Sequence, residues 1–350
     1  MITLLLDSGA FSAWRRDISI SIDEYVEFIK RNKELIFAYV NMDVIPGSKG
    51  KLIRTHESVE RSARLSYENL QRIKDKGLNP IPVFHQGENF DWLERLIDDK
   101  ESYIGISPYL RSHPNELHRW LDRCFGILAK RQGKKPIKTH GFGATGPNLL
   151  LRYPWTTVDS TSWALKGGFG QVYIPALGNK EPDFSRPTSV RFSPRITTAS
   201  GISYGMLGLD AGLRHSLNKY VRDQLDLPIE SVCNTPHTRQ DLNIIYYQGL
   251  QKHVRETRKT DDFNVVFATM IKTNPQNISL TRRGANFRLL SYFELRETKQ
   301  ERFEKYMTSG LVQCKMRRSV YDWNNESYVI RRYHDFVEHM KEIELCAEQT

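Results

Sequence analysis

The chain has 350 residues, of which 39% are hydrophobic and 26% charged, a balance that excludes a disordered or largely membrane-embedded chain. Its 51 lysines and arginines exceed its 41 acidic residues, and the resulting charge of +10 permits a polyanionic partner without requiring one. No apolar run approaches the length of about 18 residues that a membrane-spanning helix needs. The run at Met1–Leu6 lacks a preceding basic segment, so it predicts a first strand and not a signal peptide.

The cysteines indicate a reduced environment. Cys124, Cys233, Cys314 and Cys346 are widely scattered and form no CxxC pair. This spacing provides neither a disulfide framework nor a compact structural zinc motif. We therefore expect a cytoplasmic protein with reduced thiols.

The first half of the chain alternates short apolar runs with amphipathic helical patterns. Strands are predicted at residues 2–6, 35–44, 80–84, 103–106, 137–139 and 156–158, and helices at 21–31, 57–76, 92–98 and 116–131. A strand about every thirty residues, with a helix between, indicates parallel pairing through helical crossovers. Six such units favour a closed (β/α)₈ barrel of the TIM type. An open doubly wound sheet is the alternative, but it usually shows a glycine-rich phosphate turn after its first strand, which is missing here.

After Trp163 the pattern is less regular. Residues 178–203, rich in Pro, Ser, Thr and Arg, indicate an irregular basic insertion. The elements predicted around it are a strand at 172–174, a helix at 239–256, a strand at 263–269 and a strand or helix at 288–295. We therefore expect a barrel over residues 1–298 with insertions, followed by a mostly helical extension over residues 299–350.

Polar residues directly follow the predicted strands, at the ends where a barrel carries its catalytic loops. Asp7, Asp43 and Asp159 come after the first, second and sixth strands. One aspartate in such a place is usually a helix cap or a loop hydrogen-bonding group. Three carboxylates on three strands, each costly to desolvate, indicate a functional site.

Six segments at these strand ends resemble motifs of the tRNA-guanine transglycosylase superfamily, whose members are (β/α)₈ base-exchange enzymes. The first resembles the family's DSGGFQ segment, with Ala10 in place of the second glycine and Ser12 in place of glutamine. The segments keep the family's order over residues 1 to about 165 and are Asp7-Ser8-Gly9-Ala10-Phe11, Met42-Asp43, His85-Gln86-Gly87, Gly105-Ile106, His140-Gly141-Phe142-Gly143 and Val158-Asp159.

The motif sequences resemble more closely those of the DNA-acting, DpdA-like branch of the superfamily, which is found in bacteria and phages. That branch inserts 7-deazaguanines such as preQ0 into DNA. Tyr153-Pro154-Trp155 and the run from Val158 to Trp163 resemble that branch. The tRNA enzymes carry a zinc site of clustered cysteines and a histidine after the nucleophile. Here only Cys233 and His237 are candidates, and a buried thiol is the more ordinary explanation, so we expect no metal and no organic cofactor.

The resemblance implies a role for each motif residue. Asp159 is the expected nucleophile and Asp7 the general acid and base, because exchange with retention at the sugar carbon needs two inversions through a covalent intermediate. The expected base-binding residues are Ser8, Asp43, Gln86, Gly105 and Ile106, and the expected supporting residues are His140, Gly141 and Phe11.

The implied partners are DNA and a free 7-deazaguanine base, preQ0 or preQ1, with no membrane; a helper protein or a homodimer stays open. The target guanine has to be flipped out of the duplex. Backbone phosphates are expected to meet Arg15, Arg16, Lys49, Lys51, Arg186, Arg191 and Arg195. Three rival functions are exchange in tRNA, hydrolysis of a glycosidic or nucleoside bond by two carboxylates in a barrel, and a non-catalytic barrel that binds DNA or a protein.

Overall fold

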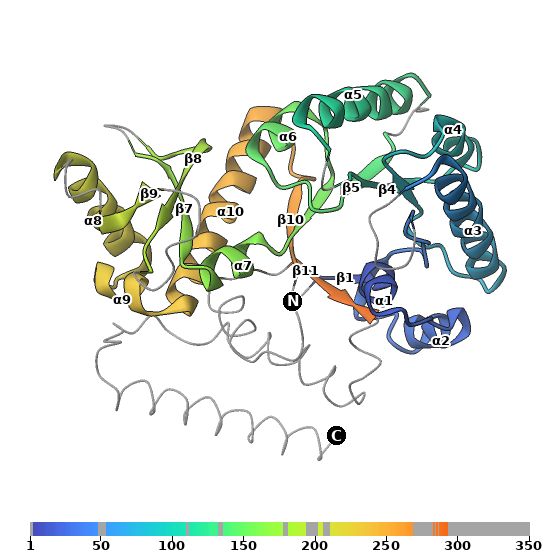
Figure 1. The fold of residues 1–350 in the computed structure, drawn as a ribbon, viewed down its shortest axis with the longest axis horizontal. Coiled ribbons are helices and arrows are strands. Elements are labelled where there is room, and N and C mark those ends of the chain that lie inside the picture. The colour runs from blue at the N-terminus through green and yellow to red at the C-terminus, as the bar shows by residue number, and fades with distance from the viewer. Residues whose placement is uncertain are drawn as a thin grey trace, which may run out of the picture. The chain divides into compact units, whose positions relative to one another are not determined.

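The structure is a computed structural model, and Figure 1 shows its ribbon. The residues it describes are 3–47, 54–109, 112–131, 136–177, 181–193, 202–205, 211–268, 283, 285 and 287–292. They belong to two compact units, one drawn from residues 1–161, 250–277 and 285–304, the other mainly from residues 162–249. A single barrel over residues 1–298 was expected, and the extension expected at 299–350 lies outside the described residues.

The first unit contains one curled sheet of eight parallel strands in the order β2-β1-β11-β10-β6-β5-β4-β3. These strands are β1 (Thr3–Asp7), β2 (Ile36–Tyr39), β3 (Val83–His85), β4 (Tyr103–Ser107), β5 (Lys138–Gly141), β6 (Thr157–Ser160), β10 (Asn264–Ala268) and β11 (Phe287–Ser291). The predicted α/β class and parallel pairing are confirmed. Because all strands run the same way, their carboxyl ends meet at one edge.

The sheet is TIM-like, but the closed ladder expected of a full barrel is missing between β2 and β3. These edge strands meet at a single parallel bridge between Val40 and Ile81. The Ile81 amide donates to the Tyr39 carbonyl and the Asn41 amide to the Ile81 carbonyl, both at 2.8 Å. Pro80 and Pro82 flank Ile81 and lack the N–H groups that a longer ladder would use, so β3 begins only at Val83.

Helices connect the strands of this unit: α1 (Ala10–Arg16), α2 (Ile22–Arg31), α3 (His56–Asp75), α4 (Phe90–Asp98), α5 (Pro114–Arg131) and α6 (Pro147–Arg152). The four predicted helices are confirmed within two residues at each end. Ser21 caps α2 by accepting from the Glu24 amide, and Thr55 forms a capping box with Ser58 at α3. The short helices α1 and α6 were not predicted, because one or two turns leave little periodicity to detect.

Apolar side chains from six of the strands and the loops beside them pack on one face of the sheet, inside its curl. This cluster contains Leu5, Val40, Ile81, Val83, Val266, Ala268 and Leu289, with Ala38, Tyr103, Phe142 and Phe287 packed against it. Side chains two residues apart on a strand face the same way. Asp7, two after Leu5, and His85, two after Val83, therefore face the same side as the cluster, at the carboxyl edge.

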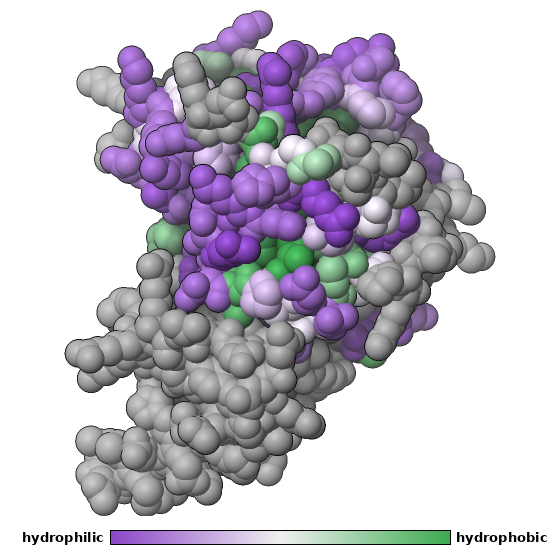
Figure 2. Space-filling model, turned by 90° about the vertical axis from the view of Figure 1, so that its left-hand side faces the viewer, coloured by the Kyte–Doolittle hydropathy of each residue, from purple (hydrophilic) through white to green (hydrophobic). Residues whose placement is uncertain are grey.

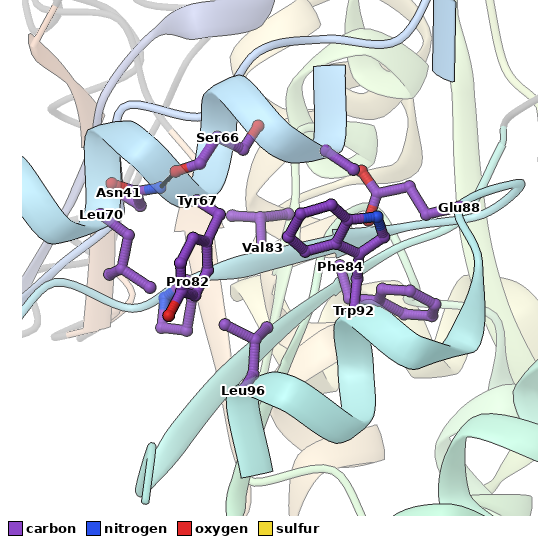
Figure 3. A pocket seen from close by; sticks show the side chains of 11 residues that line it. Asn41, Ser66, Tyr67, Leu70, Pro82, Val83, Phe84, Glu88, Trp92 and Leu96 are labelled. Atoms are coloured by element: carbon purple, nitrogen blue, oxygen red, sulfur yellow. Dashed lines mark hydrogen bonds between the residues drawn. The ribbon is translucent and has the colours of Figure 1, made fainter. Parts of the chain in front are cut away.

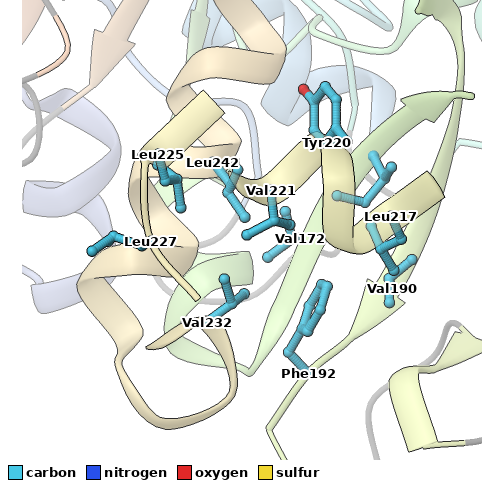
Figure 4. Packing of buried hydrophobic residues seen from close by; sticks show 11 residues of the cluster. Val172, Val190, Phe192, Leu217, Tyr220, Val221, Leu225, Leu227, Val232 and Leu242 are labelled. Atoms are coloured by element: carbon cyan, nitrogen blue, oxygen red, sulfur yellow. The ribbon is translucent and has the colours of Figure 1, made fainter. Parts of the chain in front are cut away.

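The second unit has its own sheet and core. β7 (Gln171–Ala176) pairs antiparallel with β8 (Asp183–Arg191), which pairs with β9 (Ile202–Ser203). Its helices are α7 (Ser162–Gly168), α8 (Ala211–Leu225), α9 (Ile229–Asn234) and the first part of α10 (Pro236–Arg258). Figure 4 shows apolar side chains from the sheet and from α8 to α10 pointing toward one another. The segment 178–203, expected to be irregular, thus contains a nine-residue strand, whose Val190 is buried against this core.

The side of the molecule that carries α8, β8 and β9 has a hollow apolar area, visible as a green patch framed by hydrophilic surface in Figure 2. The second unit has a cavity of about 90 Å³ between its sheet and α8, lined by Ile174, Leu177, Val190, Leu213 and Leu217 among others. Within the described part of the chain, no helix is both long and apolar enough to cross a membrane.

Candidate active site

A buried ionic cluster lies where the chain leaves β2 and β3. His85 Nε2 is 3.0 Å from Asp43 Oδ2, and His85 Nδ1 is 3.1 Å from Glu88 Oε1. The second Glu88 oxygen accepts the backbone N–H of His85 at 3.0 Å, and the Ser8 hydroxyl donates to Asp43 Oδ1 at 3.4 Å. All four side chains are buried. Burial works against the charge of His85, but the bonds with Asp43 and Glu88 outweigh it and raise the pKa of His85 to about 9.

Asp159 lies on β6 and faces the same side of the sheet as its register partner Val266. Its Oδ1 accepts the backbone N–H of Gly143 at 2.6 Å. Gly143 has φ of 63°, in the left-handed region that glycine adopts without strain, and this turn aims the amide at the carboxylate. Burial raises the pKa of Asp159 to about 6, against the opposite pull of the Gly143 amide. Asp159 is thus a mostly ionised carboxylate at pH 7 whose charge is poorly solvated.

His140 lies beside Asp159 and is fully buried. Burial lowers the pKa of His140 to about 3, so the ring is neutral at pH 7. Its Nδ1 is 2.7 Å from Thr157 Oγ1, which also contacts the Tyr103 hydroxyl, and its Nε2 is 3.7 Å from Asp159 Oδ1. Tyr103, Thr157 and His140 thus form one polar chain that ends with His140 Nε2 facing the Asp159 carboxylate. This polar chain supports Asp159 from inside the curl without adding a positive charge.

Asp7 ends β1, paired in register with Ser291 of β11. Burial raises the pKa of the Tyr25 phenol, and the charges of Asp7 and Asp43 raise it further. The two aspartates therefore act on one buried neighbour, whose hydroxyl donates to the Val40 carbonyl at 2.6 Å. Asp7 and Asp159 share the inner face and the carboxyl edge of the sheet.

The loop after β3 is held by groups that sequence reasoning did not single out. Gln86 Oε1 accepts the backbone N–H of Tyr109 at 2.9 Å, and the Gln86 carbonyl accepts from Arg54 Nη1 at 2.9 Å. The Arg54 guanidinium stacks over the Tyr109 ring, 4.2 Å from its centroid. Since the amide oxygen of Gln86 is engaged, the end that can serve a ligand is its NH₂ group.

Gly105 and Ile106, expected to bind the base, lie in β4 with backbone groups bonded to neighbouring segments, and the Gly105 amide donates to the Pro82 carbonyl at 2.8 Å. The Ile106 side chain is fully buried and its carbonyl accepts the Phe142 amide at 3.1 Å. At Gly105, a Cβ atom would come within 2.7 Å of Phe142 Cε2 and 3.3 Å of the Pro82 carbonyl. The absence of a side chain there allows β3, β4 and the Phe142 ring to approach one another closely.

We expect Gly105→Ala to lower the free energy of unfolding by about 1–3 kcal/mol, because the added methyl group overpacks this contact. Denaturant unfolding of both proteins measures the change. Gly126→Ala is the matched control, because a Cβ at Gly126 meets no atom within 4 Å. Equal losses in both variants would contradict the close contact.

The remaining candidates are more dispersed. Phe11 is exposed on α1, with its ring 5.8 Å from Trp14 and the Arg15 guanidinium 6.0 Å away. Arg15 and Arg16 end this helix and are exposed. Gly141 is packed tightly, since a Cβ there would come within 3.0 Å of Ala144 and Trp155. Of the other basic residues expected to contact DNA, Arg186 and Arg191 lie on β8 in the second unit, whereas Lys49, Lys51 and Arg195 lie outside the described residues.

No group of three or more His, Cys, Asp and Glu side chains is arranged to hold a metal ion within the residues that the structure describes. His237 Nδ1 lies 3.2 Å from Gln240 Oε1, and burial raises the pKa of the half-buried Cys233 thiol. These contacts give His237 and Cys233 local roles in the second unit.

A small cavity in the first unit has Glu88 of the ionic cluster at its wall and lies on the helix side of that cluster. It has about 20 Å³ of space, room for a single water, and lies between α3, α4 and β3 (Figure 3). Tyr67, Trp92 and Leu96 point into it from the two helices. It is a packing gap on the helix-covered side of the sheet.

Comparison of this chain with protein-family models, characterised proteins and solved structures finds no match. Any function assigned to it therefore depends on the geometry of the site and on the motifs in its sequence.

Proposed function

We propose that the protein is a DNA guanine transglycosylase, which exchanges a guanine of DNA for a 7-deazaguanine such as preQ0 or preQ1. The observation that carries this proposal is Asp159, a poorly solvated carboxylate at the carboxyl edge of a parallel sheet. It shares this edge with Asp7 and Asp43. The motif resemblance described above agrees with this arrangement. The site lies at the carboxyl edge of a TIM-like curled sheet whose edge strands β2 and β3 meet only at the bridge between Val40 and Ile81.

The proposed reaction has two displacements. Asp159 attacks C1′ of the deoxyribose, the N-glycosidic bond breaks, and Asp7 gives a proton to the departing guanine. An aspartyl ester to the sugar then holds the DNA strand. Asp7 takes the proton from the incoming base, whose nitrogen attacks C1′ and releases Asp159 as a carboxylate. Two inversions restore the original configuration, with no net redox change and no other reactant.

The surroundings of Asp159 suit a nucleophile. At pH 7 it is mostly ionised, as attack requires, while burial makes its charge unfavourable. Forming the ester removes that charge, so the buried setting favours the step. The Gly143 amide fixes one carboxylate oxygen at 2.6 Å, which orients the group for attack in the proposed reaction. The neutral His140 adds no cation that would weaken the nucleophile.

Asp43 suits the recognition of a guanine edge. An ionised carboxylate offers two acceptor oxygens, and guanine presents two donors side by side, N1–H and the exocyclic amine. In the proposed complex the NH₂ group of Gln86 donates to the O6 acceptor of the base, since its amide oxygen is engaged by Tyr109. The excess of basic residues, 51 against 41, favours a polyanionic substrate.

Nucleoside mass spectrometry tests this function. Purified protein is incubated with plasmid DNA and, separately, with bulk tRNA, each supplied with preQ0 or preQ1. The expected result is a deazaguanine deoxynucleoside in the DNA digest alone. Product in tRNA alone would overturn DNA as the substrate, and release of guanine without incorporation would indicate a hydrolase. No product in either pool and no binding of the free bases would overturn base exchange.

Asp43→Ala is expected to weaken binding of free guanine about 10–100-fold, the loss that follows when hydrogen bonds to a charged acceptor are removed. Equilibrium dialysis with labelled guanine measures the affinity. Asp75→Ala is the matched control, since Asp75 is exposed at the end of α3. Unchanged affinity in Asp43→Ala would remove the recognition role.

A further inference from the structure

We propose that His85 and Glu88 are positioning residues that determine which base the site accepts, by holding Asp43 as an oriented carboxylate that selects a heterocycle with two adjacent N–H donors. This inference rests on the proposed base-exchange function. It adds two residues to the site that the motifs did not single out as functional.

The geometry determines the charge of His85. Nε2 faces an Asp43 oxygen at 3.0 Å and Nδ1 faces a Glu88 oxygen at 3.1 Å. Two ionised carboxylates only accept hydrogen bonds, so both ring nitrogens have to donate, and only the imidazolium carries both protons. Glu88 is fixed in turn, because its second oxygen accepts the backbone N–H of His85. The imidazolium therefore cannot turn away from Asp43 without breaking the bonds to Glu88.

Other charged and titratable groups around the cluster do not replace His85. The Arg54 guanidinium acts electrostatically with Glu88, and Asp7 and Asp43 both act on the Tyr25 phenol. Ser8 adds a hydroxyl to Asp43 at 3.4 Å, which is a long hydrogen bond. His85 is therefore the cation closest to Asp43 among the groups that these contacts describe. Without it, Asp43 would lie in a buried place with the long Ser8 hydrogen bond as its remaining contact among those named here.

This arrangement sets the ligand's hydrogen-bonding pattern. The Asp43 carboxylate offers only acceptors, so it favours a base with two donors on the facing edge and disfavours a base with an acceptor there. Guanine and 7-deazaguanines with a 2-amino group have two donors, hypoxanthine has one, and adenine presents an acceptor at N1. We therefore expect guanine to bind about 10–100-fold more tightly than hypoxanthine.

Nitrogen-15 NMR of the imidazole groups in the wild-type protein gives the first test, and it needs no variant. The expected result is a histidine that stays protonated on both nitrogens at pH 8, with and without guanine, and that is missing from the spectrum of His85→Gln. A neutral ring at pH 7 would overturn the proposal.

Binding of guanine and of hypoxanthine to His85→Gln gives the second test. We expect the preference for guanine to fall at least about tenfold, since a neutral glutamine removes the charged hydrogen bond that orients the Asp43 carboxylate. Glu88→Gln, which keeps the ring in place, is expected to lose part of the preference, and more of it at high pH. His56→Gln, at the exposed start of α3, is the matched control.

The outcomes separate the two proposals. If the wild-type protein does not bind guanine, base exchange fails and this inference fails with it. If the wild-type protein prefers guanine and folded His85→Gln keeps that preference, only the positioning role is overturned. Should His85→Gln not fold, Glu88→Gln decides: an unchanged preference at every pH between 6 and 9 would overturn the role of the pair.

Discussion

We expect the substitution Asp159→Asn to abolish base exchange, with a residual rate at least about a thousandfold below that of the wild-type protein. Asparagine keeps the shape of the side chain but is not a nucleophile, so the aspartyl ester to the sugar cannot form. Exchange of labelled guanine into DNA measures the rate. A denaturing gel measures the covalent complex, which is expected in the wild-type protein and missing in the variant.

The Asp159 carboxylate also limits the rate of the wild-type reaction at low pH. Because burial raises the pKa of Asp159 to about 6, the attacking form is lost as the pH falls below that value. We expect the single-turnover rate to fall about tenfold for each pH unit below 6. Asp75→Asn, an exposed aspartate on α3, is the control and is expected to retain the wild-type profile. A covalent complex that persists in Asp159→Asn would assign the nucleophile to another residue.

The sequence predicted the parts of this molecule that depend on local patterns. Carboxylates directly after apolar runs identified Asp7, Asp43 and Asp159, since a parallel sheet brings strand ends to one edge. The structure brings Asp43 to Ser8 and His85, and Asp159 to the turn after β5. The alternation of apolar and polar residues along a strand does not show which strand ends are neighbours in space. The contacts of Asp43 and Asp159 therefore had to come from the structure.

The features that the sequence did not predict depend on contacts between residues far apart in the chain, or on local sequence signals that are weak. Asp43 and His85 are 42 positions apart, and nothing in His85-Gln86-Gly87 indicates an imidazolium between two carboxylates. The incomplete ladder at β3 depends on Pro80 and Pro82, whose effect is clear only once Ile81 is known to meet Val40. β8 was missed because its Pro, Ser, Thr and Arg content is typical of loops, whereas pairing with β7 makes it a strand.

The free energy of unfolding of the wild-type protein is expected to fall by about 3 kcal/mol as the pH rises from 6.5 to 9, because His85 changes from an ordinary pKa of 6.5 in the unfolded chain to about 9 in the folded one. Below pH 6.5 the ring is protonated in both states and the stabilisation by Asp43 and Glu88 is fully present. As the pH passes 9 the folded protein loses the proton, and the stabilisation goes with it. Denaturant unfolding at pH 6, 7.5 and 9 measures this change.

The pH range in which the free energy of unfolding falls, from 6.5 to 9, identifies His85 as the group responsible. His140, the second buried histidine among the residues that the structure describes, acts in the opposite direction and at lower pH: its pKa is lowered to about 3, so stability rises between pH 3 and 6.5 and is constant above. The raised pKa of Asp159, about 6, affects stability only below the window, while the raised pKa values of Cys124, Cys233 and Tyr25 affect it only from the ordinary pKa values of these groups in the unfolded chain upward, 9.0 for the thiols and 10.0 for the phenol. Stability is therefore expected to peak near pH 6.5. In His85→Gln the fall above the peak is expected to vanish, and a fall that persists there would assign it to another group.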